Sequence, residues 1–174
     1  MKKIVFALLL CASFGYAQDC KFKEDKIDPF TKNRVLRTNE RVLVDEFRSS
    51  VIMGLFLNKD IYIKTTFSFS GNKAIAVNES CEVLFLLKNE EVIKYPINEF
   101  ILGKTKGYGS PLLATDLTLN LNTSVENLIK IRDIGISKIR LQTTEGFVDY
   151  EVKSEKNINK IKNIIDCFIN EIKM

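Results

Sequence analysis

The feature that most limits the fold is an unbroken alternation of side chains between Ile61 and Ser70, in the sequence IYIKTTFSFS. Its odd-numbered positions hold apolar, aromatic or β-branched residues, and most even-numbered positions are polar. A period of two with such residues is typical of a strand that is buried on one face only. A polar turn at residues 58–60 follows the apolar run that begins at Val51. Residues 51–70 are therefore predicted to form a β-hairpin.

Shorter patterns of the same kind predict further strands on both sides of this hairpin. They lie at residues 35–36, 41–47, 81–88, 92–95, 117–121, 139–143 and 147–152. Together they predict a mostly antiparallel β-sheet of about eight strands. A sandwich and a curved, barrel-like sheet both agree with this pattern.

Two segments change to the helical period. Thr123 and Glu126 match a capping box, which predicts a short inserted helix that ends near Gly135. Residues 156–173 carry apolar residues three and four positions apart, which predicts a C-terminal amphipathic helix packed on the sheet. Its apolar stripe consists of Ile158, Ile161, Ile165, Phe168 and Ile172. The predicted fold class is therefore α+β.

The N-terminal residues 1–17 have the three parts of a secretory signal peptide: two lysines, an apolar core and small residues before the cleavage site. We expect cleavage after Ala17, then a polar N-terminal arm at residues 18–33 and a single β-rich domain at residues 34–174. Phe30 in the arm is expected to pack into the core. The protein is expected to be exported, to the periplasm or as a secreted protein.

Lipoprotein anchoring is not favoured, because a lipoprotein signal has a small residue directly before its cysteine. Leu10 precedes Cys11, and Asp19 precedes Cys20. After removal of the signal peptide, no remaining segment has the roughly 18 consecutive apolar residues of a transmembrane helix.

Three cysteines remain after signal removal, and an oxidising compartment permits a disulfide. The preferred pair is Cys20 with Cys167, which ties the start of the mature chain to the C-terminal helix. The other pairings and three free thiols remain open from the sequence alone. Cys81 begins an apolar strand and is expected to be an inert, buried thiol, because no activating group lies near it in the sequence.

The segment Gly103-Lys104-Thr105 ends like a phosphate-binding P-loop. That motif needs a glycine at position 98, which is Asn98, and a helix starting at the lysine. Two further glycines and a proline follow before position 112, so a helix is not expected and nucleotide binding is rejected. The segment is predicted to be a surface loop, in which Lys104, Lys106 and Tyr108 are candidate ligand contacts.

Composition excludes several chemistries. The chain has no histidine, which removes histidine-dependent hydrolases and most zinc sites. Adjacent carboxylates such as Glu90 and Glu91 point to opposite faces of a strand and cannot flank one bond. We therefore predict no catalytic residue, no metal ligand and no cofactor. Loss of two lysines with the signal lowers the net charge from +4 to +2, which does not favour nucleic acid.

The predicted function is an exported, non-enzymatic binding or interaction module of the bacterial envelope or exterior. Its partner is expected to be an envelope protein or a small ligand. The alternatives are a structural component of an envelope assembly and, less favoured, a small hydrolase that depends on carboxylates or a thiol.

Overall fold

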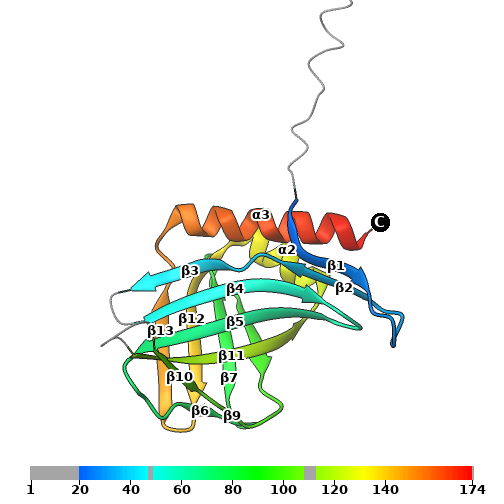
Figure 1. The fold of residues 1–174 in the computed structure, drawn as a ribbon. Coiled ribbons are helices and arrows are strands. Elements are labelled where there is room, and N and C mark those ends of the chain that lie inside the picture. The colour runs from blue at the N-terminus through cyan, green and yellow to red at the C-terminus, as the bar shows by residue number, and fades with distance from the viewer. Residues whose placement is uncertain (1–19, 47–48, 108–112, 174) are drawn as a thin grey trace, which may run out of the picture.

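The computed structural model describes residues 20–46, 49–107 and 113–173, so the predicted signal peptide lies outside the described residues. The described chain forms antiparallel sheets and two helices (Figure 1). In chain order the elements are β1 (Phe22–Ile27), β2 (Arg34–Thr38), β3 (Arg41–Glu46), β4 (Ser49–Leu57), β5 (Ile61–Ser70), β6 (Ala76–Val77), β7 (Glu82–Leu87), β8 (Val92–Pro96), β9 (Ile101–Leu102), β10 (Lys104–Gly107), β11 (Leu113–Thr123), α2 (Val125–Ile134), β12 (Ile136–Thr143), β13 (Gly146–Glu151) and α3 (Glu155–Ile172).

The larger sheet has the strand order β1-β2-β4-β5-β11-β10, and β3 also pairs with β4. Because β4 pairs with β5 along the whole length of β4, β2 and β3 share the opposite edge of β4. The strand register forms rows of side chains across the sheet, and one inward row joins Val51, Phe67 and Leu117, all completely buried. The alternation predicted for residues 61–70 is present, with the odd positions turned to the core.

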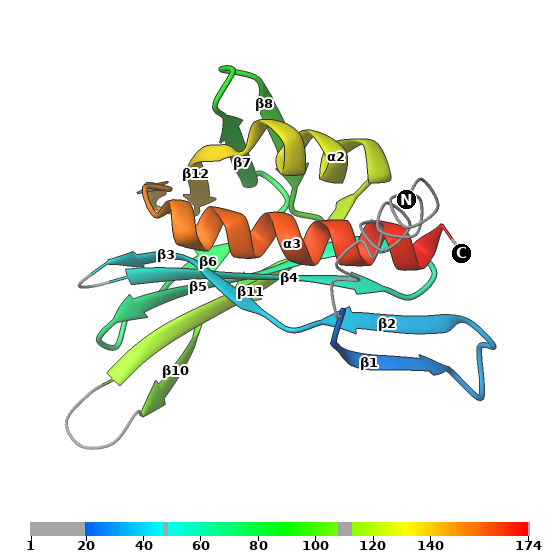
Figure 2. The same cartoon turned by 90° about the horizontal axis from the view of Figure 1, so that it is seen from above.

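The smaller sheet has the order β13-β12-β7-β8, and β6 and β9 form a separate short pair. The inner faces of the two sheets pack against each other: the rings of Phe67 and Tyr150 lie 5.5 Å apart between their centres. Seen from above, α3 lies between the larger sheet and α2 (Figure 2). The helices therefore cover one end of the space that the sheets enclose.

Local signals explain where the helices begin. The Ser154 side chain accepts a hydrogen bond from the Asn157 amide and caps α3. Ser124 caps α2 by accepting from the Asn127 amide, so the predicted cap at Thr123 is wrong by one residue. Thr123 is instead the last residue of β11, where its extended backbone completes the pairing with β5. No helix of the described segments is long and apolar enough to span a membrane.

The buried face of α3 is the predicted apolar stripe, apart from its last residue. The buried residues are Ile158, Ile161, Ile165, Phe168 and Ile169. They belong to one core with the inward residues of both sheets. Burial of an aliphatic or aromatic side chain of this size contributes about 1.5 to 3 kcal/mol, so α3 depends on the sheets for its stability.

The segment predicted as an N-terminal arm contributes a strand, because β1 pairs with β2 at the edge of the larger sheet. The prediction that Phe30 packs into the core is wrong, since this side chain is 93% exposed. The Asp28 carboxylate accepts hydrogen bonds from the amides of Phe30 and Thr31. These bonds fix the turn of the hairpin, which directs the Phe30 side chain into solvent.

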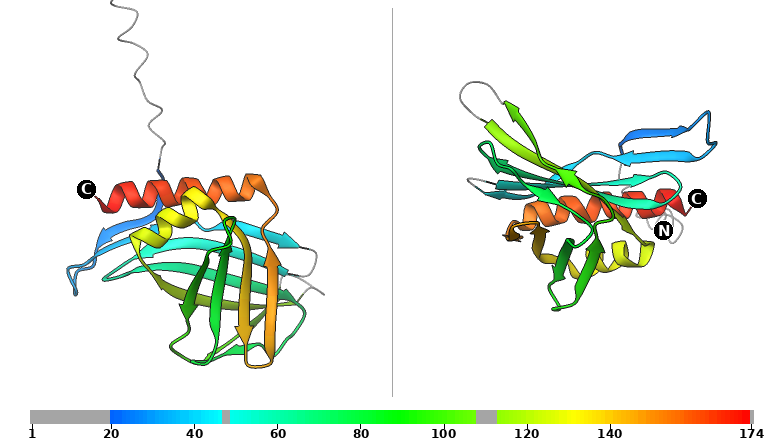
Figure 3. Two further views of the ribbon diagram at one scale, coloured as in Figure 1. Left: turned by 180° about the vertical axis from the view of Figure 1, so that it is seen from behind. Right: turned by 90° about the horizontal axis from the view of Figure 1, so that it is seen from below.

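The predicted disulfide between Cys20 and Cys167 is present and joins the residues just before β1 to α3. Beside it, the Arg34 guanidinium donates hydrogen bonds to Asp25 and to the carboxylate of Glu171, near the C-terminal end of α3. The hydrogen bond from Arg34 lowers the pKa of Asp25 below its usual value. Figure 3 shows the C-terminal end of α3 beside the β1–β2 hairpin. One covalent bond and one ion-pair cluster therefore hold this end of the helix.

The predicted α+β class with a mostly antiparallel sheet is confirmed, and the sheet is curled into a half-barrel. The described residues contain more strands than the roughly eight predicted. The strands that match none of the predicted ranges are β1, β6, β9 and β10; of these, β1 lies in the predicted arm and β10 in the predicted surface loop.

Replacement of both disulfide cysteines, in the variant Cys20→Ser/Cys167→Ser, is expected to destabilise the fold. The bridge closes a loop of 147 residues, and chain entropy alone gives a contribution of about 5 kcal/mol as an upper figure. Urea unfolding followed by circular dichroism measures the loss. A reducing agent should destabilise the wild type and leave the double variant unchanged. Equal urea midpoints for the wild type and the variant would contradict the predicted role.

Candidate functional site

A row of side chains crosses the outer face of the larger sheet. The register pairs Arg37 of β2 with Phe56 of β4, and Phe56 in turn with Tyr62 of β5. Tyr62 is paired with Asn122 of β11. The rings of Phe56 and Tyr62 lie 6.1 Å apart, and the guanidinium carbon of Arg37 lies 4.7 Å from the Phe56 ring centre. Cross-strand neighbours therefore place a cation, two rings and an amide side by side.

The next row toward β10 contains Gly54, Lys64 and Asn120. The Lys64 ammonium forms an ion pair of 2.7 Å with Glu40, whose side chain lies over Gly54. A Cβ atom at position 54 would lie 3.0 Å from the Glu40 side chain, so glycine gives this carboxylate room. The charge of Lys64 is thus balanced by Glu40, and the amide of Asn120 is the uncharged polar group of this row.

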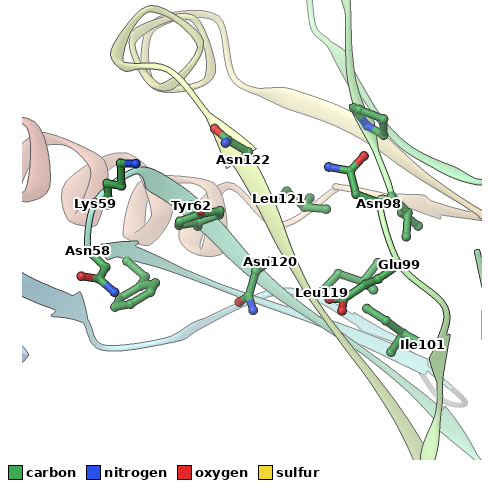
Figure 4. Close-up of a pocket in the computed structure, with 13 residues that line it drawn as sticks. Asn58, Lys59, Tyr62, Asn98, Glu99, Ile101, Leu119, Asn120, Leu121 and Asn122 are labelled. Atoms are coloured by element: carbon green, nitrogen blue, oxygen red, sulfur yellow. The ribbon is translucent and has the colours of Figure 1, made fainter. Parts of the chain in front are cut away.

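The edge of β11 is only partly covered by a strand. β10 pairs with residues 113–116 of β11, and the remaining residues 117–123 have no strand partner on that side among the described residues. The segment from Pro96 to Ile101, which leaves β8, lies across from this open edge (Figure 4). We call the gap between them the seam, because it separates the edges of the two sheets.

A pocket of about 550 Å³ lies at the seam and continues onto the outer face of the larger sheet. The turn between β4 and β5, strand β11 and the segment after β8 each contribute to it. Its lining residues are Phe56, Asn58, Lys59, Tyr62, Pro96, Ile97, Asn98, Glu99, Ile101, Leu119, Asn120, Leu121 and Asn122. In Figure 4, Asn98 extends toward β11, and Asn120 and Asn122 extend from β11 itself.

One hydrogen bond bridges the seam beside this pocket. The hydroxyl groups of Tyr95 on β8 and Thr123 on β11 lie 3.3 Å apart. Tyr95 is only 2% exposed, and burial raises the pKa of its phenol to about 12. The phenol is therefore protonated at neutral pH and is one of the contacts that join the two sheets.

The candidate ligand contacts from the sequence are not part of the seam pocket. Lys104 and Lys106 lie in β10, where the predicted loop is instead a strand, and both are exposed. Lys106 forms an ion pair of 3.0 Å with Asp116. Tyr108 lies outside the described residues. Neither lysine lines the seam pocket, so their role as ligand contacts stays a prediction.

The glycine that suggested a P-loop has a packing role. A Cβ atom at Gly103 would lie 2.8 Å from the Thr115 side chain and 3.2 Å from the Ile75 carbonyl oxygen. The Gly103 amide also donates a hydrogen bond of 2.8 Å to that carbonyl. A strand follows this residue in place of the helix that a P-loop needs.

A second cavity, of about 270 Å³, lies beside the disulfide between Cys20 and Cys167. Its polar lining includes Lys21, Arg41 and Lys160, without a carboxylate, so its chemistry differs from that of the seam pocket.

Cys81 is free and 3% exposed, and its thiol donates a hydrogen bond to the Asn78 side chain. In the described residues, no group of three His, Cys, Asp or Glu side chains is placed to hold a metal ion.

Sequence reasoning missed every polar residue of the seam pocket. The alternation in β11 does identify Asn120 as a residue of an outer face, opposite to Leu119 and Leu121. It does not show which strand lies beside it, or that Asn98 lies across the seam. Those facts depend on contacts between segments that are distant in sequence.

Comparison of the chain with protein-family models gave no match, and no curated protein or solved structure matched it either. The functional proposal therefore depends on the geometry of this chain.

The substitution Gly103→Ala is expected to destabilise the fold by about 1 to 3 kcal/mol, because the added methyl group collides with Thr115 and the Ile75 backbone. Gly107→Ala is the matched control, since a Cβ there would meet only Leu113, at 4.0 Å. It should change stability by no more than about 0.5 kcal/mol. Urea unfolding of both variants measures the difference. Equal effects of the two substitutions would contradict the packing role of Gly103.

Stability at high pH is expected to depend on Tyr95. Its pKa is about 12 in the folded protein against 10.0 for an ordinary phenol, so its protonated form favours the folded state. This stabilisation is complete below pH 10 and is lost as the pH rises toward 12, with about 1 kcal/mol lost between pH 9 and 11. Tyr95→Phe should lack this loss. Urea unfolding at both pH values tests it, and parallel losses in wild type and variant would contradict it.

Proposed function

We propose that this protein is an exported, non-enzymatic binding module whose ligand site is the seam pocket. The observation that carries the proposal is the convergence of polar side chains from three separate segments on one concavity of about 550 Å³. This volume lies within the range of small-molecule sites, which combine apolar walls with a few polar groups that fix orientation. Phe56, Tyr62 and Ile101 supply apolar wall here, and asparagines supply the polar groups.

A binding role is favoured over catalysis by the type of polar group at the pocket. Four of its lining residues are asparagines, whose amides donate and accept hydrogen bonds but do not exchange protons near neutral pH. Its charged lining residues are Lys59 and Glu99. Hydrolysis of a glycosidic bond needs two carboxylates that flank the bond, and Glu99 is the one carboxylate among the lining residues of this pocket.

Export to an oxidising compartment is supported by two independent features. One is the signal-peptide pattern at residues 1–17. The other is the disulfide between Cys20 and Cys167, a kind of bond that is rare in reducing compartments.

A fragment screen tests the binding role. Heteronuclear amide NMR of the mature, oxidised protein with a diverse set of soluble fragments should show saturable shifts for the side-chain amides of Asn98, Asn120 and Asn122. Asn98→Trp should remove this response, because Asn98 is an exposed residue whose larger replacement fills the pocket. Asn170→Trp, an exposed position on α3 away from the pocket, is the matched control and should retain the response. Shifts confined to other surfaces, or none, would contradict the proposal.

A structural role in an envelope assembly is the second candidate, and the tip of the β1–β2 hairpin favours it. Phe30 is 93% exposed and Ile27 is 60% exposed at this tip. Apolar groups exposed together mark interaction surfaces when they form a patch. Sedimentation over a range of concentrations separates the candidates: a monomer at all concentrations supports the binding module, whereas a defined multimer that Phe30→Ser disperses supports the structural role.

A further inference from the structure

The polar side chains of the seam pocket share one chemistry. Four of them are amides: Asn58, Asn98, Asn120 and Asn122. Each amide offers two N–H donors and one acceptor oxygen. In the part of the chain that the structure describes, none of these four side-chain amides has a protein hydrogen-bond partner. A ligand with many groups that both donate and accept would therefore find a partner at each of them.

The aromatic groups of the pocket add an apolar surface to this polar set. Phe56 and Tyr62 both line it, and both are half-buried. The negative face of an aromatic ring attracts groups with a small positive charge, such as the C–H groups on one face of a sugar ring. Because the register places Tyr62 directly opposite Asn122, such a ring face and an amide are available to one ligand.

The charges of the pocket cancel. Lys59 and Glu99 are its charged lining residues, so their formal sum is zero. A charged ligand loses hydration when it enters a pocket, and that cost is recovered only if an opposite charge is there to pair with it. Two cations in the neighbouring rows of the sheet, Arg37 and Lys64, form ion pairs with Glu24 and Glu40. The pocket therefore favours a ligand without net charge.

From these three observations we infer that the seam pocket binds a neutral saccharide. The amides of Asn98, Asn120 and Asn122 bond to its hydroxyl groups, and the Tyr62 ring packs against the C–H face of a sugar ring. This inference rests on the proposed function of the pocket as a ligand site, and it names the ligand class.

An extended peptide is the strongest competing occupant, because residues 117–123 of β11 present a strand edge without a strand partner among the described residues. Strand addition is driven by backbone hydrogen bonds and does not need polar side chains at the edge. The four amides and the aromatic pair would then have no role. The side-chain chemistry of the pocket therefore favours the saccharide, and peptide binding becomes an outcome of the test.

The test is a titration of the mature, oxidised protein by heteronuclear amide NMR. The probes are maltose, cellobiose, lactose and N,N′-diacetylchitobiose, each to about 10 mM, which detects dissociation constants in the millimolar class. Galacturonate is the charged comparison. A capped four-residue peptide of alternating threonine and valine represents the strand edge. At least one neutral disaccharide is expected to shift the side-chain amide resonances of Asn98, Asn120 and Asn122 saturably. Galacturonate and the peptide are expected to leave these resonances unchanged.

Two variants separate recognition from a general effect. Asn120→Asp keeps the side-chain shape and removes both N–H donors, and it is expected to weaken the disaccharide about tenfold, since a hydroxyl group then loses its donor. Asn170→Asp on α3 introduces the same change away from the pocket and should leave the affinity unchanged. Tyr62→Leu should also weaken the disaccharide, because it removes the ring. Unchanged affinity in both pocket variants would overturn the inference.

The remaining outcomes distinguish this inference from the proposed function. If fragments or the peptide shift the pocket amides and no disaccharide does, the saccharide inference is overturned and the pocket remains a ligand site. If neither fragments nor disaccharides shift them, both proposals fail.

Discussion

The pairing of β11 determines the positions of both the core and the pocket. This strand pairs with β5 along residues 114–123, but β10 covers only residues 113–116 at its other edge. Its inward leucines complete the core, so its outward residues Asn120 and Asn122 must lie on the open face. A register shift by one residue would bury these amides without partners, at a cost of about 1 to 3 kcal/mol each. The same register thus protects the core and presents the amides to solvent.

The core enclosed by the curled sheet depends on α3 as a cover. Inward residues of both sheets need an apolar cover, and the stripe that includes Ile161 and Ile165 supplies it. The disulfide at Cys167 and the ion pair of Arg34 with Glu171 hold the C-terminal half of α3 to residues at the other end of the domain, beside the β1–β2 hairpin.

Much of the fold was predictable because its strands and its C-terminal helix show a regular spacing of apolar residues in the sequence. The alternation at residues 61–70 and the stripe from Ile158 to Phe168 each report which face is buried, and both were correct. The pairing of Cys20 with Cys167 followed from their positions near the two ends of the domain. The seam pocket was not predictable, since it arises where Asn98 and β11 meet across two sheets. The resemblance of Gly103 to a P-loop glycine does not explain its presence. Glycine is needed there because the Thr115 side chain approaches too closely for a Cβ atom.

The walls of the pocket belong to parts of the chain that are fixed without a ligand. On one side β11 pairs with β5. On the other side the Ile97 amide donates a hydrogen bond of 3.2 Å to the Cys81 carbonyl, and the Gly103 amide is bonded to Ile75. Ordering of the walls would therefore take little from the binding free energy. The exposed amides are hydrated until a ligand replaces water, so each new hydrogen bond contributes modestly to affinity. A ligand that leaves some of these amides unpaired would bind more weakly, and in this way the proposed site would discriminate among small polar molecules.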